Sequence, residues 1–78
     1  MPTILRIKGF RFFFWSKEDG EPMHIHVEKA DANAKIWLNP VQDAYFYGFT
    51  TKEIREIREI VNQNLELFKL KWKEYHEK

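Results

Sequence analysis

Two histidines, His24 and His26, stand two positions apart in the segment EPMHIHVEK, residues 21–29. Side chains alternate between the two faces of a β-strand, so both imidazoles would point to the same side of an extended segment. Histidine exchanges protons near neutral pH and also binds metals. The pair therefore indicates acid–base catalysis, metal binding or contact with a partner.

A ribonuclease that uses no metal is the most specific of these functions. It needs a base for the 2′-hydroxyl proton, an acid for the leaving oxygen and a cation for the phosphate. His24 and His26 would lie about 6 to 7 Å apart along one face, enough to straddle a phosphate, so both are catalytic candidates. Basic and aromatic side chains could hold the phosphate and stack on bases or on a partner. These nucleic-acid or partner-binding candidates are Arg6, Arg11, Phe13, Trp15, Lys35 and Trp37.

A metal site would need a third ligand besides the two histidines. Glu28 is the nearest candidate on the same face, Asp31 and His76 are more distant, and the chain has no cysteine. We therefore predict no metal and no cofactor. His24, His26 and Glu28 are the fallback set of metal ligands.

The simplest interpretation assigns the histidines no chemistry. They would be strand residues stacked on Trp15 and Trp37, with a structural or partner-contact role, and this interpretation suits His24 best. Because their face carries so many aromatic side chains, we expect it to be exposed in the monomer and covered in an assembly.

The strands that position these residues can be paired from the sequence. The segment ADAN, residues 30–33, predicts a hairpin loop with Lys29 opposite Ala34 and His26 opposite Trp37. The aliphatic face would contain Ile25, Val27, Ala34, Ile36 and Leu38. The opposite face would contain His24, His26, Glu28, Lys35 and Trp37.

The same alternation extends toward the start of the chain. A two-residue turn at residues 8–9 would pair a strand before it with the aromatic strand after it, and residues 17–23 would form a longer hairpin loop. Placing Phe12 and Phe14 on the aliphatic face sends four upstream residues to the histidine side, where Glu28 is the only acid on the strands. These four residues are Arg6, Arg11, Phe13 and Trp15.

A long helix is predicted after residue 50. Thr50 and Glu53 match a capping box, and apolar residues recur at steps of three and four. The segment NQN, residues 62–64, is a weak stretch where we expect any bend. The apolar stripe consists of Ile54, Ile57, Val61, Leu65, Phe68, Trp72 and Tyr75.

Together these patterns predict an α+β fold in a single domain, residues 1–78. An antiparallel sheet of four to five strands would occupy about residues 3–49, with residues 44–49 as the last strand. One long C-terminal helix, about residues 51–76, would pack across one face. Because one helix covers only one face, the other must meet water, a ligand or a partner.

Composition narrows the classes of function. The chain of 78 residues is 44% hydrophobic, and its 13 basic and 12 acidic residues leave a net charge of +1. Any binding of nucleic acid must therefore depend on where the charges lie. The absence of cysteine fits a reducing compartment, and no stretch resembles a membrane span or a secretion signal. We predict a cytoplasmic protein without membrane contact.

The segments MPTILRIKGFRFFFWS, EPMHIHVEK and AKIWLNPV, with the closing helix, resemble a bacterial and archaeal family numbered 4160 among the domains of unknown function. In that family a second proline is more usual at the position of Met23. The resemblance implies a small stand-alone protein, encoded beside another small protein, that is the toxin component of a toxin–antitoxin pair. It supplies no catalytic residues.

Two functions are consistent with these residues. The first is a toxin-like protein that acts on or binds RNA through the face of His24 and His26, with a small antitoxin-like protein as its partner. The alternative is a non-catalytic module that binds a partner protein, or a second copy in a homodimer, through the aromatic sheet face. The sequence leaves open whether the chain is an enzyme.

Overall fold

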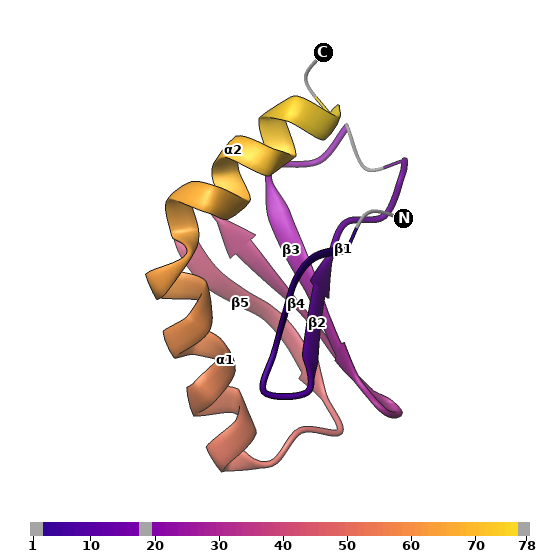
Figure 1. The fold of residues 1–78 in the computed structure, drawn as a ribbon, viewed down its shortest axis with the longest axis vertical. Coiled ribbons are helices and arrows are strands. Elements are labelled where there is room, and N and C mark those ends of the chain that lie inside the picture. Colours follow the sequence, from indigo (N-terminus) through magenta and orange to yellow (C-terminus); the bar gives the residue numbers. More distant parts are fainter. Residues whose placement is uncertain (1–2, 18–19, 77–78) are drawn as a thin grey trace.

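The computed structural model describes residues 3–17 and 20–76. They form a five-stranded antiparallel sheet in the order β1-β2-β3-β4-β5, followed by two helices (Figure 1). The elements are β1 (Thr3–Ile7), β2 (Phe10–Phe13), β3 (His24–Lys29), β4 (Ala32–Leu38), β5 (Val41–Tyr47), α1 (Thr51–Gln63) and α2 (Leu65–His76). The α+β class is thus confirmed. Among the described helices, each is too short or too polar to cross a membrane.

The β1–β2 hairpin closes through Lys8 and Gly9, as predicted. Both residues have positive φ angles, 53° and 85° respectively, and such two-residue turns match the twist of the strands they join. Ile7 therefore pairs with Phe10 directly across the turn.

The β3–β4 hairpin is tighter than predicted. Lys29 pairs with Ala32 instead of Ala34, because Ala30 and Asp31 alone form the turn. Ala30 has a φ of 52°, a conformation that residues with a side chain rarely adopt, so the sequence gives no sign of it. The predicted register is wrong by two residues. An even shift leaves every side chain on the predicted face of the sheet.

The remaining pairings complete the sheet. Phe12 faces Val27 and Phe13 faces His26 between β2 and β3, in agreement with the predicted apolar face. The last strand, β5, spans residues 41–47 and so begins earlier than the predicted segment 44–49.

The predicted single long helix is interrupted at Asn64. Its side-chain Nδ2 donates a hydrogen bond to the Ile60 carbonyl at 2.9 Å, and its backbone lies outside the helical region at φ −116° and ψ 19°. An asparagine side chain competes for backbone groups in this way, which explains why the bend falls within residues 62–64. The predicted capping box is present, with Thr50 and Glu53 bonded in both directions.

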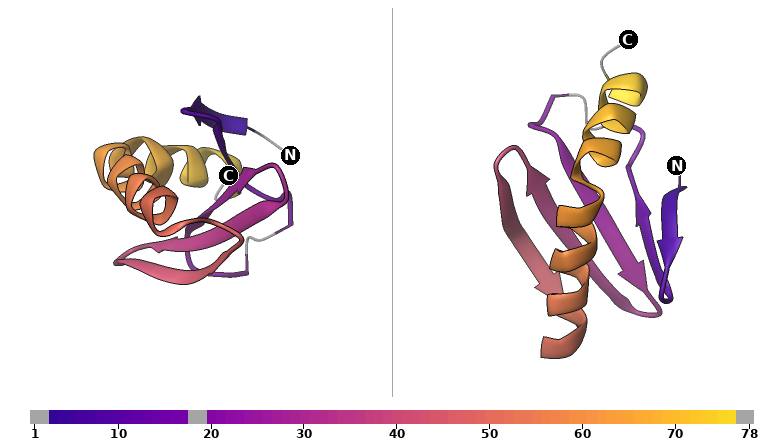
Figure 2. Two further views of the ribbon diagram at one scale, coloured as in Figure 1. Left: turned by 90° about the horizontal axis from the view of Figure 1, so that it is seen from below. Right: turned by 60° about the vertical axis from the view of Figure 1, so that its left-hand side comes forward.

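The core lies between the helices and one face of the sheet (Figure 2). Val27 and Ile36 are almost completely buried there, beneath the apolar stripe of the helices. The buried core residues are Phe10, Phe12, Phe14, Ile25, Val27, Ala34, Ile36, Leu38, Ile57, Ile60, Val61, Phe68 and Trp72. The opposite face of the sheet has no described helix over it, and we call it the open face.

Candidate functional site

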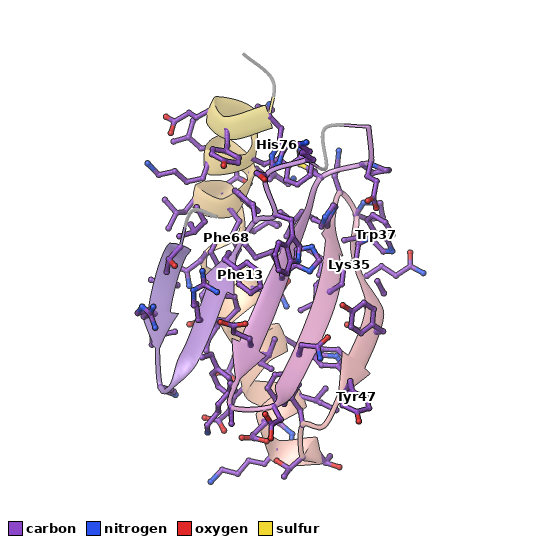
Figure 3. All side chains as sticks on the ribbon, turned by 90° about the vertical axis from the view of Figure 1, so that its right-hand side faces the viewer. Phe13, Lys35, Trp37, Tyr47, Phe68 and His76 are labelled. Atoms are coloured by element: carbon purple, nitrogen blue, oxygen red, sulfur yellow. The ribbon has the colours of Figure 1, made fainter. Side chains whose placement is uncertain are left out.

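The open face is the face of the sheet to which the sequence assigned His24, His26 and the basic and aromatic side chains. Figure 3 looks onto this face with the helices behind the sheet, and the labelled Phe13, Lys35, Trp37 and Tyr47 project from its strands. β5 adds side chains that the sequence analysis did not place, since Tyr45 pairs with Lys35 and Tyr47 with Asn33. Trp15 follows β2.

His24 does not lie exposed on this face, and the prediction of exposure is wrong for it. The side chain is fully buried, at 0% exposure. Its ring packs against Trp37 at 5.5 Å and Trp72 at 4.8 Å between centroids. Its Nδ1 lies 2.9 Å from the Pro22 carbonyl oxygen, to which it can donate a hydrogen bond. These contacts make His24 part of the packing between the sheet and α2, out of reach of a substrate.

His26 forms the floor of a hollow of about 250 Å³ on the open face. The ring is 7% exposed, so it too is more buried than predicted. It stacks on Phe13 with centroids 5.5 Å apart and meets Trp15 edge-on at 6.1 Å. Trp15 and Tyr45 are 47% and 45% exposed and form the walls. The residues that line this aromatic hollow are Phe13, Trp15, His26, Val27, Glu28, Asn33, Ala34 and Tyr45.

The cation Arg11 is fixed at the edge of the aromatic hollow. Its Nη1 lies 2.7 Å from Glu28 Oε1, its Nε donates to Thr3 Oγ1 at 2.8 Å, and its guanidinium stands 4.3 Å from the centre of the Phe13 ring. The guanidinium and the Glu28 carboxylate therefore form an oriented pair, because charged hydrogen bonds from several directions hold them.

Lys35 is paired in a similar way. Its Nζ lies 2.7 Å from Glu21 Oε1 and 4.4 Å from the centre of the Trp37 ring. Glu21 could not be assigned to this face from the sequence, because it lies in the loop before β3 and the alternation of side chains places only strand residues. The open face is consequently less basic than its strands alone suggest.

A second hollow, of about 370 Å³, adjoins the first and shares Glu28 with it. Its lining is mostly polar and consists of Arg6, Gly9, Arg11, Glu28, Lys29 and Ala30. Among the described residues, Arg6 has no carboxylate partner, whereas Lys29 is paired with Glu53 at 3.1 Å. We call this the basic hollow, and it can accept an anion beside the aromatic hollow.

A larger hollow, of about 640 Å³, is less suited to chemistry. Its lining includes Lys29, Asp31, Tyr47 and Glu53 beside Gly48 and two alanines. A backbone hydrogen bond from Thr50, followed by the Lys29 ammonium, lowers the pKa of the Glu53 carboxyl. Both residues thus serve the start of α1, and their charges compensate each other.

The fallback metal ligands are not brought together. Within the part of the chain that the structure describes, no three histidine, aspartate or glutamate side chains are placed to hold a metal ion. Glu28 is directed to Arg11, and the rings of His24 and His26 are perpendicular, at 90°. His76 lies elsewhere, with Nε2 3.1 Å from the Trp15 carbonyl oxygen and its ring against Trp72.

Comparison with known protein families identifies the family of this chain. The family described as "Domain of unknown function (DUF4160)" matches residues 9–73. The chain belongs to this family. No curated protein and no solved structure matches it. The part of the chain matched to DUF4160 contains every residue that lines the aromatic hollow, while Arg6 and His76 lie outside it.

Proposed function

We propose that this DUF4160 protein binds single-stranded RNA, with one unstacked base in the aromatic hollow and a neighbouring phosphate at the basic hollow. The observation that supports this proposal is the aromatic hollow itself, a small recess with ring walls and a polar edge on an uncovered sheet. Its volume is about 250 Å³, below the roughly 300–1,000 Å³ typical of drug-sized ligands. It suits one planar ring system.

Stacking would supply most of the affinity. Sequence-specific proteins bind unstacked RNA bases on aromatic side chains, and one stacked base is worth about 1–3 kcal/mol. The phosphate contribution would be small, because Arg11 and Lys35 already have acidic partners and the net charge is +1. With contacts from Arg6 and Arg11 only, we expect a slope of log affinity against log salt of about −0.7 to −1.4.

We also propose that the protein is the toxin component of a toxin–antitoxin pair in the cytoplasm, and that RNA is its target. A small antitoxin-like partner would neutralise it by covering the open face, where Trp15, Tyr45 and Tyr47 are exposed. Cleavage by a pair of histidines is not part of this proposal, since His24 is buried. His26 is the histidine that lines the hollow.

Binding of a fluorescently labelled RNA octamer, followed by anisotropy, tests the proposal. Tyr45→Ala removes a wall of the hollow and should weaken binding by roughly 5- to 150-fold, the equivalent of one stacked base. Tyr47→Ala is the matched control, because Tyr47 is a 67% exposed tyrosine of the same strand that does not line this hollow. Equal affinities for the two variants would refute the placement of the base.

The alternative function, a non-catalytic module that binds a protein or its own copy, is favoured by one observation. Trp15, Tyr45 and Tyr47 expose large aromatic surfaces on one face, and such patches are common in protein interfaces. Light scattering over a concentration series would reveal a homodimer. Self-association that Trp15→Ala abolishes, in a protein that binds no RNA, would establish this alternative in place of RNA binding.

A further inference from the structure

We infer that the aromatic hollow selects guanine, which the carboxylate of Glu28 reads; this inference rests on the proposed binding of RNA. Glu28 on β3 and Asn33 on β4 are directly opposite each other in the sheet, and both line the hollow. They form a polar edge, while the exposed rings of Trp15 and Tyr45 form the walls. A base lying between the rings would direct its hydrogen-bonding edge at Glu28 and Asn33.

The chemistry of a carboxylate discriminates among the four bases. An ionised carboxylate only accepts hydrogen bonds, through two oxygens side by side. Guanine presents two adjacent donors on its Watson–Crick edge, N1–H and the N2 amino group. Adenine presents one donor beside one acceptor, cytosine one donor beside two acceptors, and uracil one donor between two acceptors. Guanine is therefore the one base that can satisfy both oxygens of Glu28 without placing an acceptor against them.

The carboxylate of Glu28 can accept further hydrogen bonds from a base. Arg11 Nη1 donates to Oε1 at 2.7 Å, and among the described residues none donates to Oε2. A carboxylate offers about four lone-pair sites, so Oε1 can accept a second donor while Arg11 stays in place. Because Arg11 is itself held by Thr3 and stacked over Phe13, the carboxylate is oriented before any base arrives.

Asn33 complements this selection from the other side of the hairpin. Its amide group both donates and accepts, and guanine carries the acceptors O6 and N7 beyond its Watson–Crick donors. The pair of Glu28 and Asn33 can therefore serve donors and acceptors of the same base. The guanine belongs to an RNA strand in this inference, because the basic hollow that shares Glu28 offers Arg6 for the strand's phosphate.

The test compares labelled octauridylates that carry guanine, adenine, cytosine, uracil or hypoxanthine at one central position. Wild-type protein should bind the guanine strand roughly tenfold more tightly than the adenine and cytosine strands. The hypoxanthine strand, which lacks the N2 amino group, should fall between them. Glu28→Gln replaces one acceptor with a donor and should abolish the preference, so that this variant binds the guanine strand no more tightly than the adenine strand.

The matched control is Glu21→Gln. Glu21 is also an acid paired with a basic side chain on this face, but it does not line the aromatic hollow. This variant should keep the preference for guanine. Circular dichroism and urea unfolding of both variants would show that the fold is retained, which is expected because the Glu28 side chain is 44% exposed.

The outcomes separate the inference from the function on which it rests. Equal binding of all five strands by the wild type would overturn guanine selection and leave RNA binding intact. No binding of any strand would overturn both. Guanosine monophosphate should compete weakly, because it lacks the rest of the strand. If it competes as well as the guanine strand, the selection of guanine stands, but the ligand that carries the guanine is then a free nucleotide and not an RNA strand.

Discussion

Replacing Trp72 with alanine should loosen the end of the molecule at which α2 meets the sheet. Trp72 is 2% exposed and packs against Phe14 at 5.3 Å, His24 at 4.8 Å and His76 at 3.9 Å between ring centroids. Trp72 thus connects α2 with the segment that follows β2 and with the start of β3. The variant Trp72→Ala removes all three contacts at once.

The size of the effect follows from buried area. A buried aromatic side chain removes roughly 150–250 Å² from water, worth about 4–6 kcal/mol at about 25 cal/mol per Å². Measured replacements of core aromatics by alanine cost about 3–5 kcal/mol. We therefore expect the free energy of unfolding to fall by about 4 kcal/mol. This is a large share of the about 4–12 kcal/mol expected for a chain of 78 residues.

Urea unfolding followed by circular dichroism measures the loss, with Leu70→Ala as the control. Leu70 lies on the same helix but is 53% exposed, so its replacement should change the stability by no more than about 0.5 kcal/mol. Modification of the protein by diethyl pyrocarbonate, mapped by mass spectrometry, reports the second effect, since His24 should become reactive only in Trp72→Ala. Equal stability of the two variants would refute the packing of α2 on His24.

The remaining predictions concern the core, the cap and pH. Val27→Asp or Ile36→Asp should each cost several kcal/mol, because an unpaired charge would be buried; a melting temperature close to that of the wild type for both would contradict the core side assigned to the hairpin. Thr50→Ala should cost about 1 kcal/mol through loss of the cap, measured by urea unfolding against Thr51→Ala. Folding lowers the pKa of Glu53 below its usual 4.5. The stability that Glu53 contributes is therefore present above pH 4.5 and lost as the pH falls through the lowered pKa, so Glu53→Gln should flatten the pH profile of the urea midpoint between pH 3 and 6.

Much of the sheet could be predicted because alternation in sequence has a fixed consequence in space. Residues of even number in β3 face one way whatever the register, so a hairpin misplaced by two residues still put Val27 and His26 on their correct sides. The misplacement came from Ala30, whose positive φ has no signal in an alanine. Glycine or asparagine at this position would have marked the turn.

The burial of His24 could not be predicted, for a different reason. Alternation tells which face of the sheet a side chain projects from, but burial depends on which side chains from elsewhere in the chain pack against it. Trp72 and Trp37 enclose His24 from α2 and β4, and no local pattern around residue 24 indicates this. Tyr45, in contrast, lies at the site because β5 pairs with β4. Its position could have been predicted, since the segment AYFYGF has the composition of a strand.

The interruption at Asn64 has a consequence for how the chain can change in length. Each residue of an α-helix turns the following ones by about 100° about the axis. One residue inserted or deleted between α1 and α2 would therefore swing Trp72 from the core toward solvent, while the residues of α1 kept their contacts. The rotation of α2 about its axis relative to α1 is therefore fixed by the joint, and Asn64 maintains this rotation through its hydrogen bond to Ile60. Three or four residues added together would nearly restore this rotation, so we expect homologous chains to differ in length at this joint by whole turns.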